Sequence, residues 1–148
     1  MRTKASGFSI LEMIVVLALI AVILGVFIYR LGGVGDQNRI ETARGDLRAI
    51  QTAINAYYLN HNNTFPSGTD WLNNDLVNDN PRVLRQIVYD PFRSGNVEYS
   101  YVLRVNYYVA FSYGPDKTQD ITGIRGDTGE LLGQNDDDIY ITNGVGFS

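Results

Sequence analysis

Carboxylates are the side chains of this sequence best suited to chemistry, and three of them stand together near its C-terminus. Asp136, Asp137 and Asp138 come directly before an apolar segment that begins at Ile139. Adjacent carboxylates repel one another unless a positive group neutralises them, and Ca²⁺ takes about six to eight oxygen ligands from carboxylates and backbone carbonyls. A run of acids before a strand can equally be a solvated stretch that discourages aggregation. Both interpretations stay open at this point.

A second carboxylate of interest, Glu12, lies inside a long apolar run. From Phe8 to Ile28 the only other interruptions are Ser9 and Gly25. The run has a length of roughly 21 residues, which is enough for a helix to span the membrane's hydrocarbon layer of about 30 Å. We therefore predict a transmembrane helix over residues 8–30. A charged side chain near the centre of such a helix costs about 3 kcal/mol, so Glu12 is expected to have a function.

The short segment before this run is basic. Arg2 and Lys4 are not offset by any acid there, and they orient the N-terminus toward the cytoplasm by the positive-inside bias. A secretory signal peptide has a shorter apolar core and a cleavage site with small residues, and neither is found here. The rest of the chain is expected on the other side of the membrane.

Catalysis finds little support in the sequence. There is one histidine, His61, no cysteine, and no phosphate-binding loop. The glycine-rich segment Gly123–Gly129 is interpreted as a plain loop. The formal net charge of −4 and the lack of a basic patch argue against a nucleic-acid partner. We expect a chain that is not an enzyme.

An amphipathic helix is predicted at residues 36–60. Its apolar residues recur at spacings of three and four, which places them on one face. They are Ile40, Ala43, Leu47, Ile50, Ile54 and Tyr57. Asp36 is expected to cap this helix, because the glycines at residues 32–35 weaken helix formation before it. Those glycines form either a bending point or a plain linker.

Residues 61–96 are expected to form a loop, with short helical pieces at Trp71-Leu72 and Val83-Leu84. Within residues 97–148, alternating apolar residues predict two antiparallel strands, at 97–103 and 107–113, joined as a hairpin. A last strand is expected at Ile139–Thr142. The predicted fold class is therefore α+β, with a long N-terminal α-helix packed on a small C-terminal antiparallel β-sheet.

The N-terminal residues resemble the leader of type IV prepilins: Lys4 precedes Gly7, Phe8 follows it, and Glu12 is the fifth residue of the apolar run. The resemblance implies that a prepilin peptidase removes residues 1–7, cutting between Gly7 and Phe8, and N-methylates Phe8. It also implies that Phe8 and Glu12 carry assembly, since the Glu12 carboxylate would pair with the Phe8 amine of a neighbouring subunit. Without the leader, solvation of Glu12 at the headgroup level would be an equal alternative.

Four short landmarks further along the chain resemble those of the major pseudopilins of type II secretion. In order, they are Phe65-Pro66, Asp90-Pro91-Phe92, Ser112–Asp116 and Asp136–Ile139. The resemblance implies a type IV pilin-like fold and a structural calcium ion, with Asp116 and some of Asp136, Asp137 and Asp138 as ligands. The interval 117–135 is longer than is usual in that family. Three acids within it could therefore join or replace the expected ligands: Asp120, Asp127 and Glu130.

These resemblances imply a single-pass protein of the bacterial inner membrane, with residues 31–148 as a soluble periplasmic domain. Its copies would polymerise into a helical pseudopilus that drives export of folded proteins across the outer membrane. The implied partners are the prepilin peptidase, the inner-membrane assembly platform, minor pseudopilins and the membrane before assembly. One alternative is a surface type IV pilin serving adhesion, motility or electron transfer. Another is a membrane-tethered periplasmic binding domain that does not polymerise.

Overall fold

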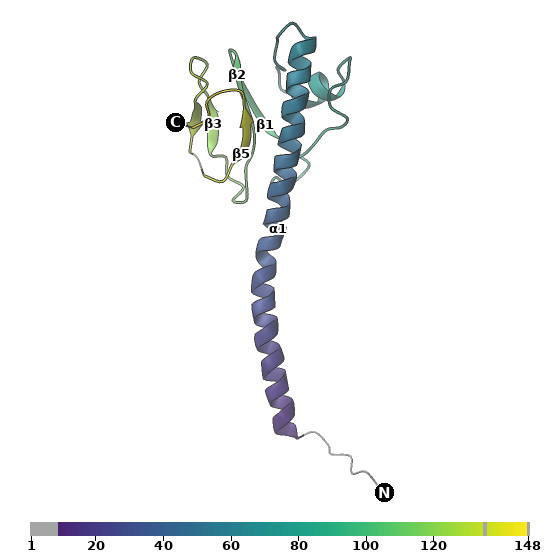
Figure 1. The fold of residues 1–148 in the computed structure, drawn as a ribbon, viewed down its shortest axis with the longest axis vertical. Helices are drawn as coiled ribbons and strands as arrows, with labels where there is room; N and C mark the ends of the chain where they lie inside the picture. The colour runs from purple at the N-terminus through teal and green to yellow at the C-terminus, as the bar shows by residue number, and fades with distance from the viewer. Residues whose placement is uncertain (1–8, 135, 148) are drawn as a thin grey trace. The chain divides into compact units, whose positions relative to one another are not determined.

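The computed structural model describes residues 9–134 and 136–147, and it describes only the backbone of residues 26–34. A long helix is followed by a short π-helix and five short strands (Figure 1). The elements are α1 (Ile10–Asn60), η1 (Leu72–Val77), β1 (Ser100–Arg104), β2 (Tyr107–Ser112), β3 (Ile121–Ile124), β4 (Leu131–Gly133) and β5 (Ile139–Thr142). This arrangement confirms the predicted α+β class and is consistent with a type IV pilin-like fold.

The chain divides into two compact units, with the boundary between Gln37 and Asn38. In the first unit, the large apolar side chains described from Ile10 to Leu24 are 44% to 81% exposed. The second unit contains the rest of α1, η1 and all five strands, and it has the hydrophobic core. The two units are therefore described separately below.

Helix α1 continues through the glycines at residues 32–35 without a break. Asp36 lies inside the helix, so the prediction that it caps a restarted helix is wrong. A glycine costs only about 1 kcal/mol relative to alanine in a helix, and helices already formed on both sides of the glycines can outweigh that cost. Helix propensity alone was a weak guide at this position.

The C-terminal half of α1 packs through the face that its periodicity predicts. Its buried residues are Ala43, Leu47, Ile50, Ala53 and Ile54, and Ile40 and Tyr57 pack against the same core. Each of the five buried side chains is at most 2% exposed. Removal of apolar surface from water therefore holds this half of the helix against the sheet.

The main sheet is antiparallel, with strand order β1-β2-β5. A tight turn at Val105 and Asn106 joins β1 to β2, with Arg104 opposite Tyr107, as the predicted hairpin requires. Strand β5 pairs with the other edge of β2, with Ile139 opposite Ser112. The three predicted strands are therefore confirmed, with β1 beginning at Ser100 rather than at residue 97.

A second sheet, formed by β3 and β4, lies in a segment that we predicted as loop. It packs on the face of β2 that points away from α1, where Val109 and Phe111 form a second core with Ile121, Ile124 and Leu131. The plain-loop interpretation of residues 123–129 is therefore wrong at Gly123 and Ile124, which belong to β3. Figure 1 shows β3 on the far side of the main sheet from α1. The second unit thus has three layers.

The segment between α1 and β1 is mostly irregular. Trp71 is buried and stacks on Tyr101, with ring centroids 4.3 Å apart. The expected helical piece near residue 72 is present as η1, but none is found at Val83-Leu84. Instead, the backbone N–H groups of Val83 and Leu84 both donate to the carbonyl oxygen of Leu76, which ties this segment to η1.

Candidate functional site

The predicted acidic residues meet at one edge of the main sheet. Asp116 follows the end of β2, and Asp136–Asp138 come directly before β5. Because β2 and β5 are antiparallel and Ser112 lies opposite Ile139, the segment that follows β2 meets the residues that precede β5. The sheet register therefore brings together carboxylates that are far apart in the sequence.

Among the described residues, one group of three carboxylates is arranged closely enough to hold a metal ion. It consists of Asp116, Asp120 and Asp137, each of which offers an oxygen within 4.8 Å of the other two. Two of these residues belong to the predicted set of ligands. Asp120, one of three acids that the sequence left as additional candidates, reaches the group because β3 begins at the next residue, Ile121.

Hydrogen bonds from backbone N–H groups fix three of these acidic side chains. The N–H of Asp116 donates to Oδ2 of Asp137 at 2.8 Å, and the N–H of Thr118 donates to Oδ1 of Asp116 at 2.7 Å. Oδ2 of Asp138 accepts from the N–H groups of Asp120 and Ile121, at 2.9 and 2.7 Å. Asp138 therefore clamps the start of β3 to the start of β5.

Three oxygens of the acidic residues at this edge are shielded from solvent and lack a hydrogen-bond partner: Oδ2 of Asp120 and Oδ1 of Asp137 in the converging group, and Oδ1 of Asp138 beside it. A buried acceptor without a partner typically costs about 1–3 kcal/mol, and more when it is charged. A cation would satisfy such oxygens. A set of converging carboxylate oxygens also has the chemistry that Ca²⁺ prefers.

Burial and the closeness of the carboxylates also raise pKa values in this group. Burial raises the pKa of Asp120, and the negative charges of Asp116, Asp136 and Asp137 raise this pKa further. Burial also raises the pKa of Asp138, although the two backbone N–H groups that it accepts from oppose the shift. Carboxylates are thus held close together against their mutual repulsion.

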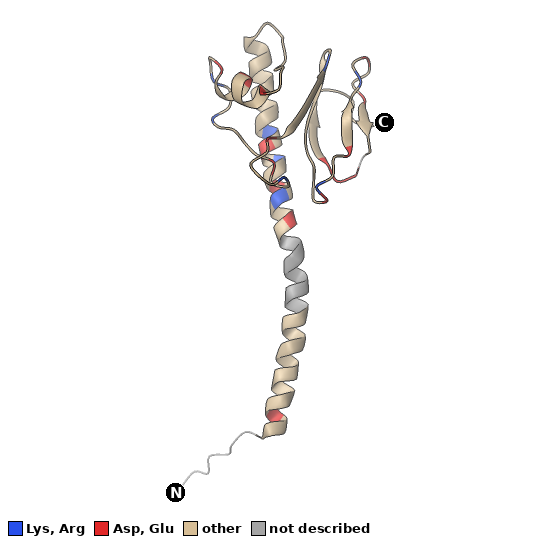
Figure 2. Ribbon diagram, turned by 180° about the vertical axis from the view of Figure 1, so that it is seen from behind, with Lys and Arg blue, Asp and Glu red and all other residues tan. Residues whose placement is uncertain are grey.

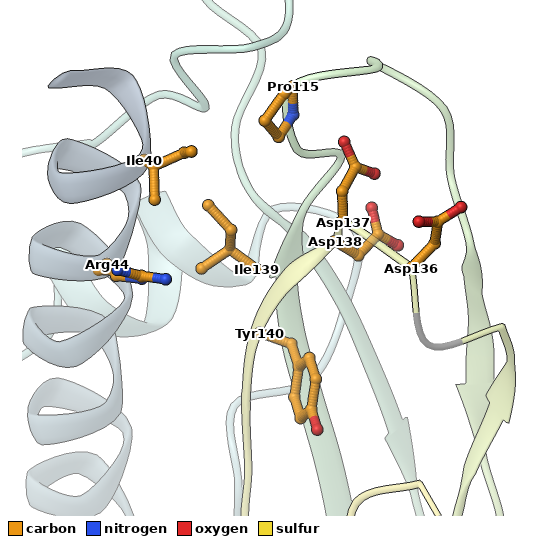
Figure 3. A pocket seen from close by; sticks show the side chains of 8 residues that line it. All are labelled: Ile40, Arg44, Pro115, Asp136, Asp137, Asp138, Ile139 and Tyr140. Atoms are coloured by element: carbon orange, nitrogen blue, oxygen red, sulfur yellow. The ribbon is translucent and has the colours of Figure 1, made fainter. Parts of the chain in front are cut away.

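Asp136 has a different place. With Asp137 and Asp138 it lines a pocket of about 350 Å³, and Ile40 and Arg44 of α1 line the opposite side (Figure 3). Arg44 also forms an ion pair with Glu41 at 2.9 Å. Asp136 is not one of the three carboxylates that converge. Its predicted role as a ligand stays a prediction, as does that of Asp138.

The predicted assembly residues lie at the other end of the chain. Gly7 and Phe8 are outside the described residues, whereas Glu12 is exposed in the first turn of α1. In Figure 2 the N-terminal part of α1 is almost entirely tan, whereas blue and red bands gather on its C-terminal half. Glu12 thus stands among the exposed apolar side chains of the first unit, and large exposed apolar surfaces mark interfaces with proteins or membranes.

No helix within the described part of the chain is both long enough and apolar enough to cross a membrane. The predicted span over residues 8–30 begins at Phe8, outside the described residues, and it includes residues 26–30, whose side chains are not described. This span stays a prediction.

Comparison with known proteins gives a family match at the N-terminus and one similar protein. Residues 2–28 match a family model described as a prokaryotic N-terminal methylation motif. A stretch of 66 residues is 30% identical to Type II secretion system core protein G of Pseudomonas aeruginosa. These two matches support a type IV pilin-like family. The matched stretch covers 45% of this chain and 46% of that relative, so it spans about half the length of each. No solved structure gives a significant match.

Proposed function

We propose that this type IV pilin-like chain is a structural subunit that polymerises into the pseudopilus of a type II secretion system. The observation that carries the proposal is Glu12, a single carboxylate in the exposed apolar part of α1. The methylation motif matched over residues 2–28 surrounds it. An exposed apolar helix with one charge requires partners, and copies of the same helix with a positive amine at Phe8 would supply them.

In this proposal, a prepilin peptidase cuts after Gly7 and methylates Phe8 in the inner membrane. The amine of Phe8 in one subunit then pairs with Glu12 of its neighbour as the assembly platform and minor pseudopilins extract the chain from the membrane. The filament pushes folded proteins across the outer membrane. The similarity to Type II secretion system core protein G supports this choice over a surface pilus.

Substitution of Glu12 tests the assembly step. Glu12→Ala is expected to abolish filaments, measured by electron microscopy and by sedimentation of the periplasmic fraction of cells that produce the chain. The matched control is Glu41→Ala, which removes another exposed acid of α1 from the second unit. Normal filaments from Glu12→Ala, or retention of residues 1–7 in cells with an active prepilin peptidase, would refute the proposal. A long extracellular fibre would instead indicate a surface pilin.

The proposal includes a calcium ion at the cluster of Asp116, Asp120 and Asp137. The three unpartnered buried oxygens described above, one of which belongs to Asp138, support a bound cation. When bound, the ion would neutralise charge and link the segments after β2, before β3 and before β5. These residues would hold the loops of a domain that has no cysteine for a disulfide.

Thermal unfolding of the full chain in detergent, with calcium and with a chelator, tests the ion. Calcium at a hundred times its dissociation constant is expected to stabilise the fold by about 2.7 kcal/mol. Asp120→Asn should lose most of this shift. Asp127→Asn should keep it, because Asp127 lies in the turn after β3, outside the cluster, and accepts from the N–H of Thr128. An identical midpoint with calcium and with chelator would rule out the calcium site.

A further inference from the structure

Asp90 is a buried carboxylate that the cation cluster does not include. Its side chain is 2% exposed. Oδ1 accepts hydrogen bonds from the N–H of Phe92 at 3.0 Å and from the hydroxyl of Ser112 at 2.7 Å, and Oδ2 accepts from the N–H of Tyr113 at 3.1 Å. A carboxylate can accept from all three donors, whereas the NH₂ group of an amide cannot accept at all. The arrangement therefore favours a carboxyl group over an amide at this position.

The partners of Asp90 lie at the end of β2 and in the turn that follows it. Ser112 is the last residue of β2, and its hydroxyl oxygen accepts from the N–H of Gly114 at 3.4 Å. Three successive residues, Ser112, Tyr113 and Gly114, are thus fixed directly or indirectly by one buried carboxylate. Two residues further along, the N–H of Asp116 donates to Asp137. The same turn therefore connects Asp90 to the cation cluster.

We infer that Asp90 is a positioning residue for the cation site. It holds the turn Ser112–Gly114 in the one place from which the carboxylate of Asp116 reaches Asp120 and Asp137. This inference rests on the proposed calcium site and assigns a function to a residue outside the group of carboxylates that would hold the ion. It also joins two landmarks of the sequence, Asp90–Phe92 and Ser112–Asp116, into one structural unit.

Calcium titration of the full chain in detergent, by calorimetry, tests the inference. Direct partners of metal ligands typically change affinity by about 10–100-fold when mutated; Asp90 acts through the turn and contacts no ligand itself, so Asp90→Asn is expected to weaken calcium binding by about tenfold, the lower end of that range. The matched control is Asp75→Asn, since Asp75 also accepts from a backbone N–H, that of Ser67, at 2.9 Å. It should leave the affinity unchanged. An unchanged affinity in Asp90→Asn would overturn the inference.

Hydrogen exchange of the chelator-treated protein gives a second readout that does not depend on calcium binding. Neither Asp90→Asn nor Ser112→Ala alters Asp137, the residue that accepts from the N–H of Asp116. Both variants are nonetheless expected to exchange this N–H at least about tenfold faster, while the amides of Leu47 and Ile50 in α1 keep their rates. Such a local change distinguishes positioning from general stability, which would accelerate all three.

The two readouts separate the two proposals. If the unaltered chain binds no calcium, the calcium site is wrong, and the exchange rate of Asp116 still decides whether Asp90 positions the turn. If Asp90→Asn does not fold, Ser112→Ala carries both measurements. Loss of folding in both variants, or equal acceleration of all amides, would assign Asp90 to stability alone and overturn the inference.

Discussion

Replacement of Gly114 by alanine is the sharpest test of how the acidic cluster is built. Gly114 has a φ of +66°, in the left-handed region that L side chains rarely adopt. A Cβ there would collide with the carbonyl oxygen of Asp137 and lie 2.8 Å from its carbonyl carbon. Asp137 is part of the converging carboxylate group, so the added methyl group must displace the cluster itself.

The expected loss of stability has two parts. An alanine in the left-handed region costs about 1 kcal/mol. Forced overlap in a packed region adds about 1–3 kcal/mol. The control is Gly95→Ala, because Gly95 also has a positive φ, +90°, but nothing lies within 4 Å of its added Cβ. Gly95→Ala should therefore lose only the first part, and the difference between the variants isolates the contact with Asp137.

Thermal unfolding of the full chain in detergent measures this difference. Trp71 is the only tryptophan and is 5% exposed, so its fluorescence reports unfolding of the second unit. In a domain of roughly 100 residues, 1 kcal/mol shifts the midpoint by about 4 °C, so Gly114→Ala should melt about 4–12 °C below Gly95→Ala. Midpoints within about 2 °C of each other would refute the reasoning that Gly114 makes room for Asp137.

Three further predictions concern the rest of the second unit. Ile50→Ala should destabilise the fold by about 2–5 kcal/mol, since Ile50 is fully buried, whereas Leu59→Ala, at a side chain 76% exposed, should leave the urea midpoint nearly unchanged. Burial raises the pKa of Asp46 above its usual 3.8, while the hydrogen bond from Tyr99 lowers it. The stability linked to this raised pKa is fully present below pH 3.8, and it is lost as the pH rises through the pKa of Asp46 in the folded protein. The melting temperature of the unaltered chain minus that of Asp46→Asn should therefore be larger at about pH 3.5 than at about pH 7. Val105 has a φ of +54° and is 76% exposed, so Val105→Gly should raise the melting temperature by a few degrees, and a lower one would show that the turn is unstrained.

Periodicity predicted the parts of the fold in which one face of an element is buried. The spacing from Ile40 to Tyr57 gave the buried face of α1, since a helix with a single packed face must repeat its apolar residues every three or four positions. The β1–β2 hairpin followed from alternation on both sides of residues 104–106, although the structure pairs Arg104 with Tyr107 and leaves only two residues in the turn. In both cases, burial leaves a pattern in the local sequence.

The β3–β4 hairpin left no such pattern, because its strands are short and contain glycine. Ile121, Ile124 and Leu131 are its buried residues. A different sign of this layer was present in β2, where consecutive residues from Tyr108 to Phe111 are all apolar. A strand without alternation is buried on both faces. The predicted helix could pack against only one face of β2, so another element had to pack against the other face.

The set of carboxylates in the acidic cluster depends on the β3–β4 hairpin, which the sequence did not predict. The family resemblance implied Asp116 and Asp137 as ligands, but Asp120 reaches them only because β3 starts at Ile121 and packs on β2. The N–H groups of Asp120 and Ile121 both donate to Asp138, which precedes β5. Whatever holds β3 in place therefore also holds Asp120 near Asp116 and Asp137.

Packing of the hairpin and repulsion within the cluster consequently oppose each other. Burial of Ile121 and Ile124 against Val109 and Phe111 favours β3 on the sheet, while the same position forces the charge of Asp120 toward other carboxylates. A ligand that binds only this folded arrangement adds its binding free energy to the stability of the fold. A cation at the cluster would therefore secure the third layer as well as the acidic loops, because the two share the residue pair Asp120 and Ile121.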